Sequence, residues 1–491
     1  MDKKKFLKTV LSFKINKNKK PFFTSKKIYN YLENLNQDSE IKKINTIISD
    51  IFKVPLDDIE FDLKKSFFRK INFVDGVFNS RFKFFYLLKD LTILICFITW
   101  YKFFSKNLNI KKKSIIFFDE LDNEKHLSYY KKLNKKFNNS SIFFFKKKNI
   151  ETRIKKKYQI INFKKLCIYN KLTLKNNFFI FFYLIIQILK NSYLNKINLF
   201  NVYNLLFFRI FKYDTIFFEN RSKYYFSSKI INSSKIKHFF FKKYGGYKIA
   251  YIQKNLAELS ISFFLTSDIF FSLGNFSTYQ IHSLGSNIKK IVPVGSLFLE
   301  SSYIGRKHKA LDIDILNIGI NWIHKNNVKL DNKIDINYYR HINWLKKIST
   351  KYPHLKILIK HHDNYQGDIS ENKIINGSNV DIIINDKNNT TYEYILRSKL
   401  IFSFGSTMIL EAKSPGKYSY FLDPDGLNQS YFKFLKKGKS IKITSYAEFE
   451  KTIKKHFYKR GKNNFFSKNK LNNYYCLKSD KVSEKIFQNL V

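Results

Sequence analysis

The chain has 491 residues, enough for two or three domains, and 44% of them are hydrophobic, with only 6 Pro and 15 Gly. This composition excludes a disordered or collagen-like chain and predicts substantial buried cores. Lys and Arg number 90 against 38 Asp and Glu, a formal net charge of +52, which favours anionic lipid headgroups or phosphate-bearing substrates as partners. Only nine of the basic residues are Arg, the residue best suited to reading phosphate and guanine, so no nucleic acid is expected as a partner.

The three cysteines, Cys96, Cys167 and Cys476, lie far apart and predict neither a disulfide framework nor a metal cluster. The basic amino terminus lacks the uninterrupted apolar stretch of a signal peptide. No segment reaches about 18 uncharged apolar residues, so no membrane-spanning helix is expected. Two shorter apolar segments, Leu91–Trp100 and Phe178–Leu189, suit either a buried helix or a helix in the membrane interface. We expect a cytoplasmic protein with affinity for the inner face of a membrane.

Residues 1–110 are expected to form a mostly helical region, to which no motif assigns a role. From residue 111 short apolar runs alternate with polar or amphipathic stretches, a pattern typical of a parallel sheet with both faces covered. The pattern predicts a doubly wound, Rossmann-like domain over 111–300. Its strands are expected at Ser114–Phe118, Ser140–Lys147, Asp214–Asn220, Lys248–Gln253, Asp268–Gly274 and Lys290–Ser296.

The alternation restarts after a basic connector, Ser301–Leu311, and predicts a second Rossmann-like domain over 311–491. Its strands are expected at Asp314–Trp322, Leu355–His362, Val380–Asp386, Lys399–Ser406 and Tyr418–Gly426, and its helices at Tyr338–Pro353, Thr390–Ser398, from Met408, and at Tyr446–Tyr458. The fold class is therefore α/β, with two doubly wound domains facing a cleft. Such domains bind ligands at the carboxyl ends of their strands.

The most informative stretch is Leu400–Gly426, where a strand runs into Gly405 and the next residues, Ser406 and Thr407, open a helix. Backbone N–H groups, hydroxyls and the helix dipole at that point favour an anion such as a nucleotide phosphate. Glu411 lies one helical turn further on, where a carboxylate can accept hydrogen bonds from ribose or sugar hydroxyls. The alternative is that Ser406 only caps the helix and Glu411 is solvated.

A second candidate is Lys360, His361 and His362 at the end of a strand. No third ligand at recognisable spacing accompanies the two histidines, so no metal is expected. An imidazole facing the crevice can donate a hydrogen bond to phosphate, and Lys360 adds positive charge. Adjacent strand residues point to opposite faces, so only one of the two histidines is expected to face the ligand.

Two further strand ends, Gln253-Lys254 and Gly295-Ser296, are either cleft-lining residues or ordinary turns between a strand and a helix. The sequence holds no Walker loop, GxGxxG, GxSxG, HExxH or CxxC motif. Their absence counts against P-loop NTPases, classical dehydrogenases, α/β hydrolases and zincins.

Taken together, these motifs resemble the two-domain GT-B glycosyltransferases of bacterial surface and capsule polysaccharide biosynthesis. CDP-glycerol glycerophosphotransferases and polysialyltransferases are looser kin. The resemblance covers Lys248–Gly426, with KIAYIQ, DIFFSLG and KIVPVGS in the first half and LKILIKHH and SKLIFSFGSTMILEAKSPG in the second. The resemblance rests on the order of these motifs along the chain, because each motif alone is a weak indication of the family.

The resemblance implies roles for individual residues. Ser406 and Thr407 would hold the donor phosphates, Glu411 would contact the donor sugar or ribose, His361 or His362 would neutralise the leaving phosphate, and Gly295 and Ser296 would line the cleft. This chain departs from the family pattern at two places. Lys254-Asn255 stand where His-Gly is expected, and His362-Asp363 stand where His-Pro is usual.

The leading hypothesis is an enzyme that transfers a sugar or polyol phosphate from a nucleotide-activated donor to a surface polysaccharide or glycolipid. The resemblance implies a metal-independent reaction without an organic cofactor, and the sequence identifies no catalytic base. Two alternatives stay open. One is a non-catalytic protein of the same fold that binds a glycan or membrane and supports a partner enzyme, and the other is a nucleotide-sugar epimerase.

Overall fold

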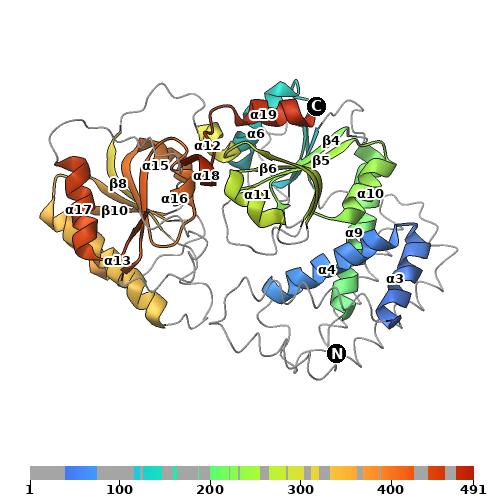
Figure 1. Ribbon diagram of the computed structural model, residues 1–491, viewed down its shortest axis with the longest axis horizontal. Coiled ribbons are helices and arrows are strands. Elements are labelled where there is room, and N and C mark those ends of the chain that lie inside the picture. Colours follow the sequence, from blue (N-terminus) through green and yellow to red (C-terminus); the bar gives the residue numbers. More distant parts are fainter. Residues whose placement is uncertain are drawn as a thin grey trace.

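The structure is a computed structural model. It describes residues 39–73, 116–121, 125–145, 159–162, 186, 199–220, 222–230, 233–254, 265–282, 286–302, 311–319, 332–361, 369–384, 386, 389–424, 441–458 and 472–491. These residues form two lobes, each built around a parallel sheet (Figure 1).

The first lobe holds a seven-stranded sheet within the described residues, in the order β3-β2-β1-β4-β5-β6-β7, and all its pairings are parallel. Its strands are β1 Ile116–Leu121, β2 Ile142–Phe145, β3 Gln159–Asn162, β4 Tyr224–Ser227, β5 Lys248–Ile252, β6 Thr266–Ser272 and β7 Asn287–Pro293. Its helices are α3 Ser39–Phe52, α4 Leu56–Phe73, α6 Lys125–Lys136, α9 Leu199–Asn220, α10 Lys235–Lys243, α11 Asn275–His282 and α12 Leu297–Ser302.

The second lobe holds a six-stranded parallel sheet within the described residues, in the order β10-β9-β8-β11-β12-β13. Its strands are β8 Ile313–Ile318, β9 Ile357–Lys360, β10 Val380–Ile383, β11 Ser398–Ser403, β12 Tyr418–Leu422 and β13 Lys442–Ile443. Its helices are α13 Asn332–Lys351, α14 Ile369–Ile375, α15 Thr391–Arg397, α16 Met408–Glu411 and α17 Tyr446–Phe457. The predicted α/β class with two Rossmann-like doubly wound domains is confirmed.

The last two helices, α18 Asn472–Tyr475 and α19 Val482–Leu490, leave the second lobe. The α19 helix lies beside α6 on the first lobe (Figure 1). Val482, Ile486 and Leu490 pack into the hydrophobic core of that lobe, and Lys248 Nζ donates to the carbonyl of Leu490 at 3.0 Å. The predicted second domain extended to residue 491, whereas the chain returns to the first lobe before it ends.

The α3 and α4 helices, inside the predicted region 1–110, pack on the first lobe against α9 and α10. Asp62 of α4 is fully buried and binds the start of α10, where it accepts hydrogen bonds from Ser234 Oγ and from the N–H groups of Lys235 (3.2 Å) and Ile236 (3.3 Å). The negative carboxyl group thus lies at the positive end of a helix. Burial raises the pKa of Asp62 although Arg209 lies nearby. This segment therefore belongs structurally to the first lobe.

Two predicted elements differ from the structure. Asp214–Asn220, predicted as a strand, is the last third of the 22-residue helix α9. A short apolar run does not distinguish a buried strand from a buried helix, and here the run continues an apolar helix that starts at Leu199. The helix expected from Met408 is only four residues long.

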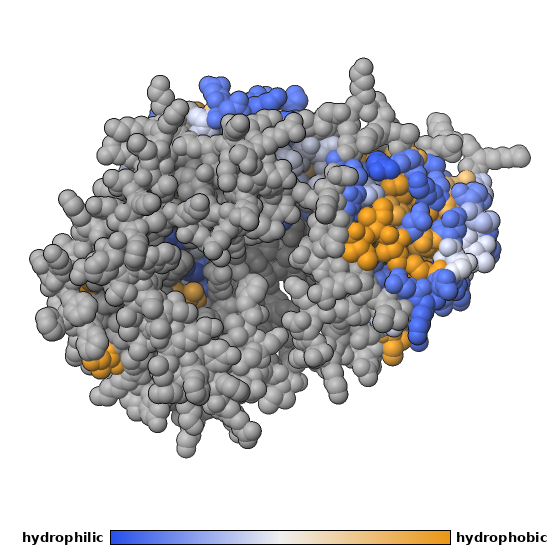
Figure 2. All heavy atoms as spheres, turned by 180° about the vertical axis from the view of Figure 1, so that it is seen from behind, coloured by the Kyte–Doolittle hydropathy of each residue, from blue (hydrophilic) through white to orange (hydrophobic). Residues whose placement is uncertain are grey.

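Several expectations lie outside the described residues: Cys96, Cys167, Leu91–Trp100, His362, and nearly all of Phe178–Leu189 and of the basic connector. In the part of the chain that the structure describes, no helix combines the length and apolar character needed to cross a membrane. Figure 2 shows hydrophobic side chains gathered on the second lobe and bordered by hydrophilic ones.

Candidate functional site

The order of strands in the second sheet places a topological switch point between β8 and β11. From β8 the chain proceeds outward through β9 and β10 on one side, and then through β11, β12 and β13 on the other. Ligands of open parallel sheets bind outside the carboxyl ends of the strands at such a point. The strand ends that meet here are Gly319 after β8, His361 after β9, and Ser403–Ser406 after β11.

The turn after β11 is held together by serine hydroxyls. Ser403 Oγ donates to the carbonyl of Ile318 at 2.6 Å and accepts from the N–H groups of Gly405 (3.3 Å) and Ser406 (3.0 Å). Ser406 Oγ accepts from the N–H of Met408 at 3.3 Å. Three N–H groups of the predicted anion site are thus bonded within the turn. The half-buried hydroxyls of Ser406 and Thr407 remain candidates for binding phosphate, and that role stays a prediction.

His361 lies buried at the end of β9, and its ring fills the space above Gly319. A Cβ atom at Gly319 would lie 2.2 Å from His361 Nδ1, so only glycine allows the ring this position. The other ring nitrogen, Nε2, lies 3.1 Å from Glu371 Oε1 of α14. Lys360 is also buried, and its Nζ donates to the carbonyl of His361 at 2.6 Å. The predicted pair Lys360 and His361 therefore lies together at the switch point.

Several polar side chains that the sequence analysis missed surround His361. We call Asn317, Tyr338, His341, His361 and Glu371 the polar cluster; all five are buried. The Tyr338 hydroxyl donates to Glu371 Oε1 at 3.1 Å, and His341 Nε2 lies 2.9 Å from Asn317 Oδ1. Tyr338 and His341 are three residues apart on α13 and so share a helix face. The helical spacing of Tyr338 and His341 could be read from the sequence, but there it indicated only the apolar face of a helix.

His341 is held as a neutral imidazole. Burial lowers its pKa to about 3, and repulsion from His361 acts in the same direction. Its ring stacks on Phe404, with centroids 5.8 Å apart and planes inclined at 24°. His341 thus packs against the turn after β11.

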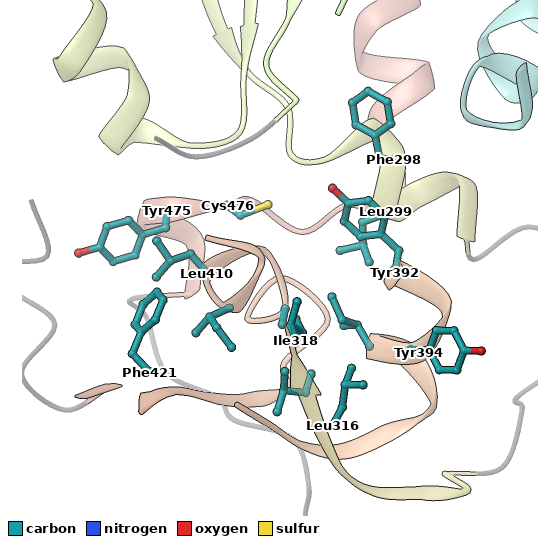
Figure 3. Close-up of a cluster of buried hydrophobic side chains, with 14 of the residues drawn as sticks. Phe298, Leu299, Leu316, Ile318, Tyr392, Tyr394, Leu410, Phe421, Tyr475 and Cys476 are labelled. Atoms are coloured by element: carbon teal, nitrogen blue, oxygen red, sulfur yellow. The ribbon is translucent and has the colours of Figure 1, made fainter. Parts of the chain in front are cut away.

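Glu411, predicted to contact the donor sugar or ribose, is fully buried where the two lobes meet. Its Oε2 accepts hydrogen bonds from Ser296 Oγ of the first lobe and from the Tyr392 hydroxyl of the second, both at 2.9 Å. Burial raises the pKa of Glu411 to about 7, against the opposing effects of these two hydrogen bonds and of the Lys254 charge. Figure 3 shows the apolar part of this interlobe contact, with Leu299 of α12 against Tyr392 and Cys476 beside them.

The predicted cleft residues Gly295 and Ser296 also contact the chain segment that returns to the first lobe. We call residues 474–479 the strap. Gly295 has φ +97°, and a Cβ there would lie 2.8 Å from Ser479 Oγ. The Ser296 N–H donates to Ser479 Oγ at 2.9 Å. On the side of the second lobe, Ser414 Oγ donates to the carbonyl of Leu477 at 2.7 Å. The strap is therefore bonded to both lobes.

The remaining predicted cleft residues lie at the end of β5. Gln253 is buried, and its Oε1 accepts from the N–H of Leu273 at 3.0 Å. This bond joins the ends of β5 and β6. Lys254 Nζ lies 5.6 Å from the centroid of the Phe298 ring. Its role toward an acceptor stays a prediction. Among the described residues, no group of three or more His, Cys, Asp or Glu side chains is arranged to hold a metal ion.

No family model matches the sequence, and no curated protein matches it. Among solved structures, the chain is similar to the UDP-GlcNAc 2-epimerase of Methanocaldococcus jannaschii, at 9% identity over 77% of this chain and 99% of that chain, with a TM-score of 0.43. It is also similar to a putative UDP-N-acetylglucosamine 2-epimerase of Listeria monocytogenes, at 9% identity over 76% and 95% of the two chains, with a TM-score of 0.48. The wall teichoic acid polymerase TagF is 12% identical over 83% and 97%, with a TM-score of 0.42. Such identities concern the fold alone.

Proposed function

We propose that the protein is an enzyme that binds a nucleotide-activated donor at the β8–β11 switch point and transfers a sugar or polyol phosphate to a surface polysaccharide or glycolipid. The observation that carries the proposal is the convergence of Lys360, His361 and the Ser406 turn at one end of the second sheet. A lysine, an imidazole and hydroxyls at strand ends suit a phosphate group.

The proposed chemistry needs stabilisation of the departing nucleotide. As the bond between the donor group and the nucleotide phosphate breaks, negative charge develops on the phosphate oxygen. Lys360 and His361 are the described groups that would stabilise this charge, and fixed groups shielded from water do so effectively. The acceptor hydroxyl needs a base, to which no residue is assigned. The excess of lysine would hold the enzyme near a lipid-linked acceptor on an anionic membrane.

Ligand-linked stabilisation tests donor binding. The melting temperature is measured with UDP-, CDP-, GDP- and CMP-linked compounds, and one class is expected to stabilise the protein by about 2–3 kcal/mol at roughly 100-fold excess over its dissociation constant. His361→Gln should abolish that stabilisation. His354→Gln is the matched control, because His354 is exposed and bonds Tyr458 away from the switch point. No shift with any class would overturn the proposal.

Product analysis then separates the reactions. The binding donor is incubated with and without a lipid-linked glycan acceptor, and the products are identified by NMR. Loss of donor and growth of the acceptor support the proposal. Formation of an epimer without acceptor would instead indicate a nucleotide-sugar epimerase, and binding without turnover would indicate a non-catalytic protein.

A further inference from the structure

Glu411 joins the two lobes through one carboxylate oxygen. Ser296 follows β7 of the first sheet and Tyr392 lies on α15 of the second lobe, and both hydroxyls donate to the same atom, Oε2, at 2.9 Å. The carboxyl group is completely buried. A separation of the lobes would therefore break the Ser296 bond and expose Glu411 to water.

The second oxygen, Glu411 Oε1, is buried, and no hydrogen-bond partner lies near it among the residues that the structure describes. A carboxylate has two strong acceptor oxygens, and burying one of them unpaired is costly for the charged form. The protonated form suits the site better, because only one of its oxygens is a strong acceptor. The geometry thus favours a carboxyl group that carries a proton while the lobes are in contact.

The charged and titratable groups around Glu411 come from each element that packs there. Lys254 at the end of β5 is the positive charge that acts on Glu411, and Tyr392 and Cys476 are the neighbouring acids. Tyr129 of α6 acts on Tyr392. Burial raises the pKa of Cys476 to about 12, so the thiol stays neutral near pH 7. Protonation of Glu411 is accordingly opposed by the hydrogen bonds from Tyr392 and Ser296 and by one charged group, Lys254.

We infer that Glu411 is a positioning residue that holds the two lobes together in its protonated form, rather than a ligand of the donor sugar. The strap is the reporter of this contact, because it is bonded to Ser296 and Ser414 and its Leu477 N–H donates to the carbonyl of Leu273 at 2.8 Å. The inference does not depend on the proposed reaction, because it concerns the free protein.

The direction of the pH dependence follows from proton linkage. With the lobes in contact, the pKa of Glu411 is about 7, against an ordinary value of 4.5. The equilibrium constant for contact between the lobes is therefore largest below about pH 4.5. It falls about tenfold per pH unit as the pH rises to about 7, and it is constant above that pH.

Hydrogen–deuterium exchange of the full chain tests the inference. Exchange of the strap, corrected for the intrinsic effect of pH, is followed between pH 5 and 8.5 without ligand. Wild-type exchange should accelerate toward pH 7 and then level off, and Glu411→Gln, which mimics the protonated form, should remove this dependence. The helix α13 serves as the internal control, because it packs within the second lobe.

A second variant guards against failure of Glu411→Gln to fold. Lys254→Met removes the positive charge that opposes protonation of Glu411. The pH at which exchange of the strap levels off should therefore move above 7. Glu300→Gln is the matched control, since Glu300 is also a buried glutamate that accepts from a serine, Ser483, and it should leave the profile unchanged. A flat wild-type profile would overturn the inference, as would a wild-type dependence retained in Glu411→Gln. So would a Glu411→Gln protein that keeps the wild-type profile and loses only donor binding.

Discussion

The interlobe contact and the polar cluster of the second lobe each bury a glutamate, but the two carboxyl groups face different partners. Within the described part of the chain, Glu411 accepts from two hydroxyls, those of Ser296 and Tyr392, whereas Glu371 faces the imidazole of His361 as well as a tyrosine. Burial raises the pKa of the Glu411 carboxyl group to about 7 and lowers the pKa of the His341 imidazole to about 3. Loss of water penalises the charged form of each group, so the same physical cause moves the pKa of an acid and the pKa of a base in opposite directions.

The largest expected effect is the loss of stability at acid pH that His341 of the polar cluster causes. The pKa of His341 is about 3 in the folded protein against 6.5 ordinarily, so the unfolded chain binds the extra proton between these values. Stability contributed by neutral His341 is present above pH 6.5 and lost as the pH falls, by about 4 kcal/mol in total by pH 3. His341→Gln should remove this loss, as measured by urea unfolding from pH 4 to 7. An unchanged acid slope in the variant would contradict the assignment.

Two glycine-to-alanine substitutions test how much the contact between Gly295 and the strap contributes to stability. Gly295→Ala introduces a left-handed alanine whose Cβ would meet Ser479 Oγ at 2.8 Å and the carbonyl of Leu477 at 2.9 Å. We expect a loss of about 3 kcal/mol in the free energy of unfolding. Gly377→Ala is the matched control, because Gly377 has φ +70° and no atom of the described residues lies within 4 Å of an added Cβ. It should cost only about 1 kcal/mol. Equal losses measured by urea unfolding would show that the strap contact is unimportant.

The hydrogen bonds of Glu371 can be removed directly. Glu371→Met leaves His361 Nε2 and the Tyr338 hydroxyl without their acceptor, and about 2 kcal/mol of stability should be lost. Glu371→Gln keeps an acceptor oxygen and should recover part of that loss. The measurement is thermal unfolding with and without the best nucleotide compound. If Glu371→Met binds that compound as tightly as the wild type, the cluster does not position His361 for binding.

The smallest change tests one bond of the interlobe contact. Tyr392→Phe removes one of the two donors to Glu411 Oε2, and we expect a loss of about 1 kcal/mol. The loss should be greater at pH 8 than at pH 5, because a hydrogen bond to a charged acceptor is stronger. Urea unfolding at the two pH values measures it. Equal losses at the two pH values would indicate that Glu411 keeps the same protonation state at both.

Much of the fold was predictable from apolar runs. The strands β5, β6, β8, β9, β11 and β12 occur where short apolar segments predicted them, because buried parallel strands are continuous in their hydrophobicity. The strand predicted at Asp214–Asn220 was wrong because a buried helix can hold the same run. Lys360 and His361 were predicted to lie at the end of a strand, and they do lie at the end of β9. Glu371 and His341 were not predicted as site residues, because polar residues on an amphipathic helix usually face water.

By itself, the sequence determined the α/β class, the two Rossmann-like domains and the strand ends at which Gly405, Ser406 and His361 lie. Only the tertiary structure decided the neighbours of those residues. Glu411 lies five residues after Ser406 in the chain, yet it bonds to Ser296 of the other lobe. Local periodicity records which face of an element is buried, whereas the partner of a buried polar group depends on how distant elements pack, which neither spacing nor composition encodes.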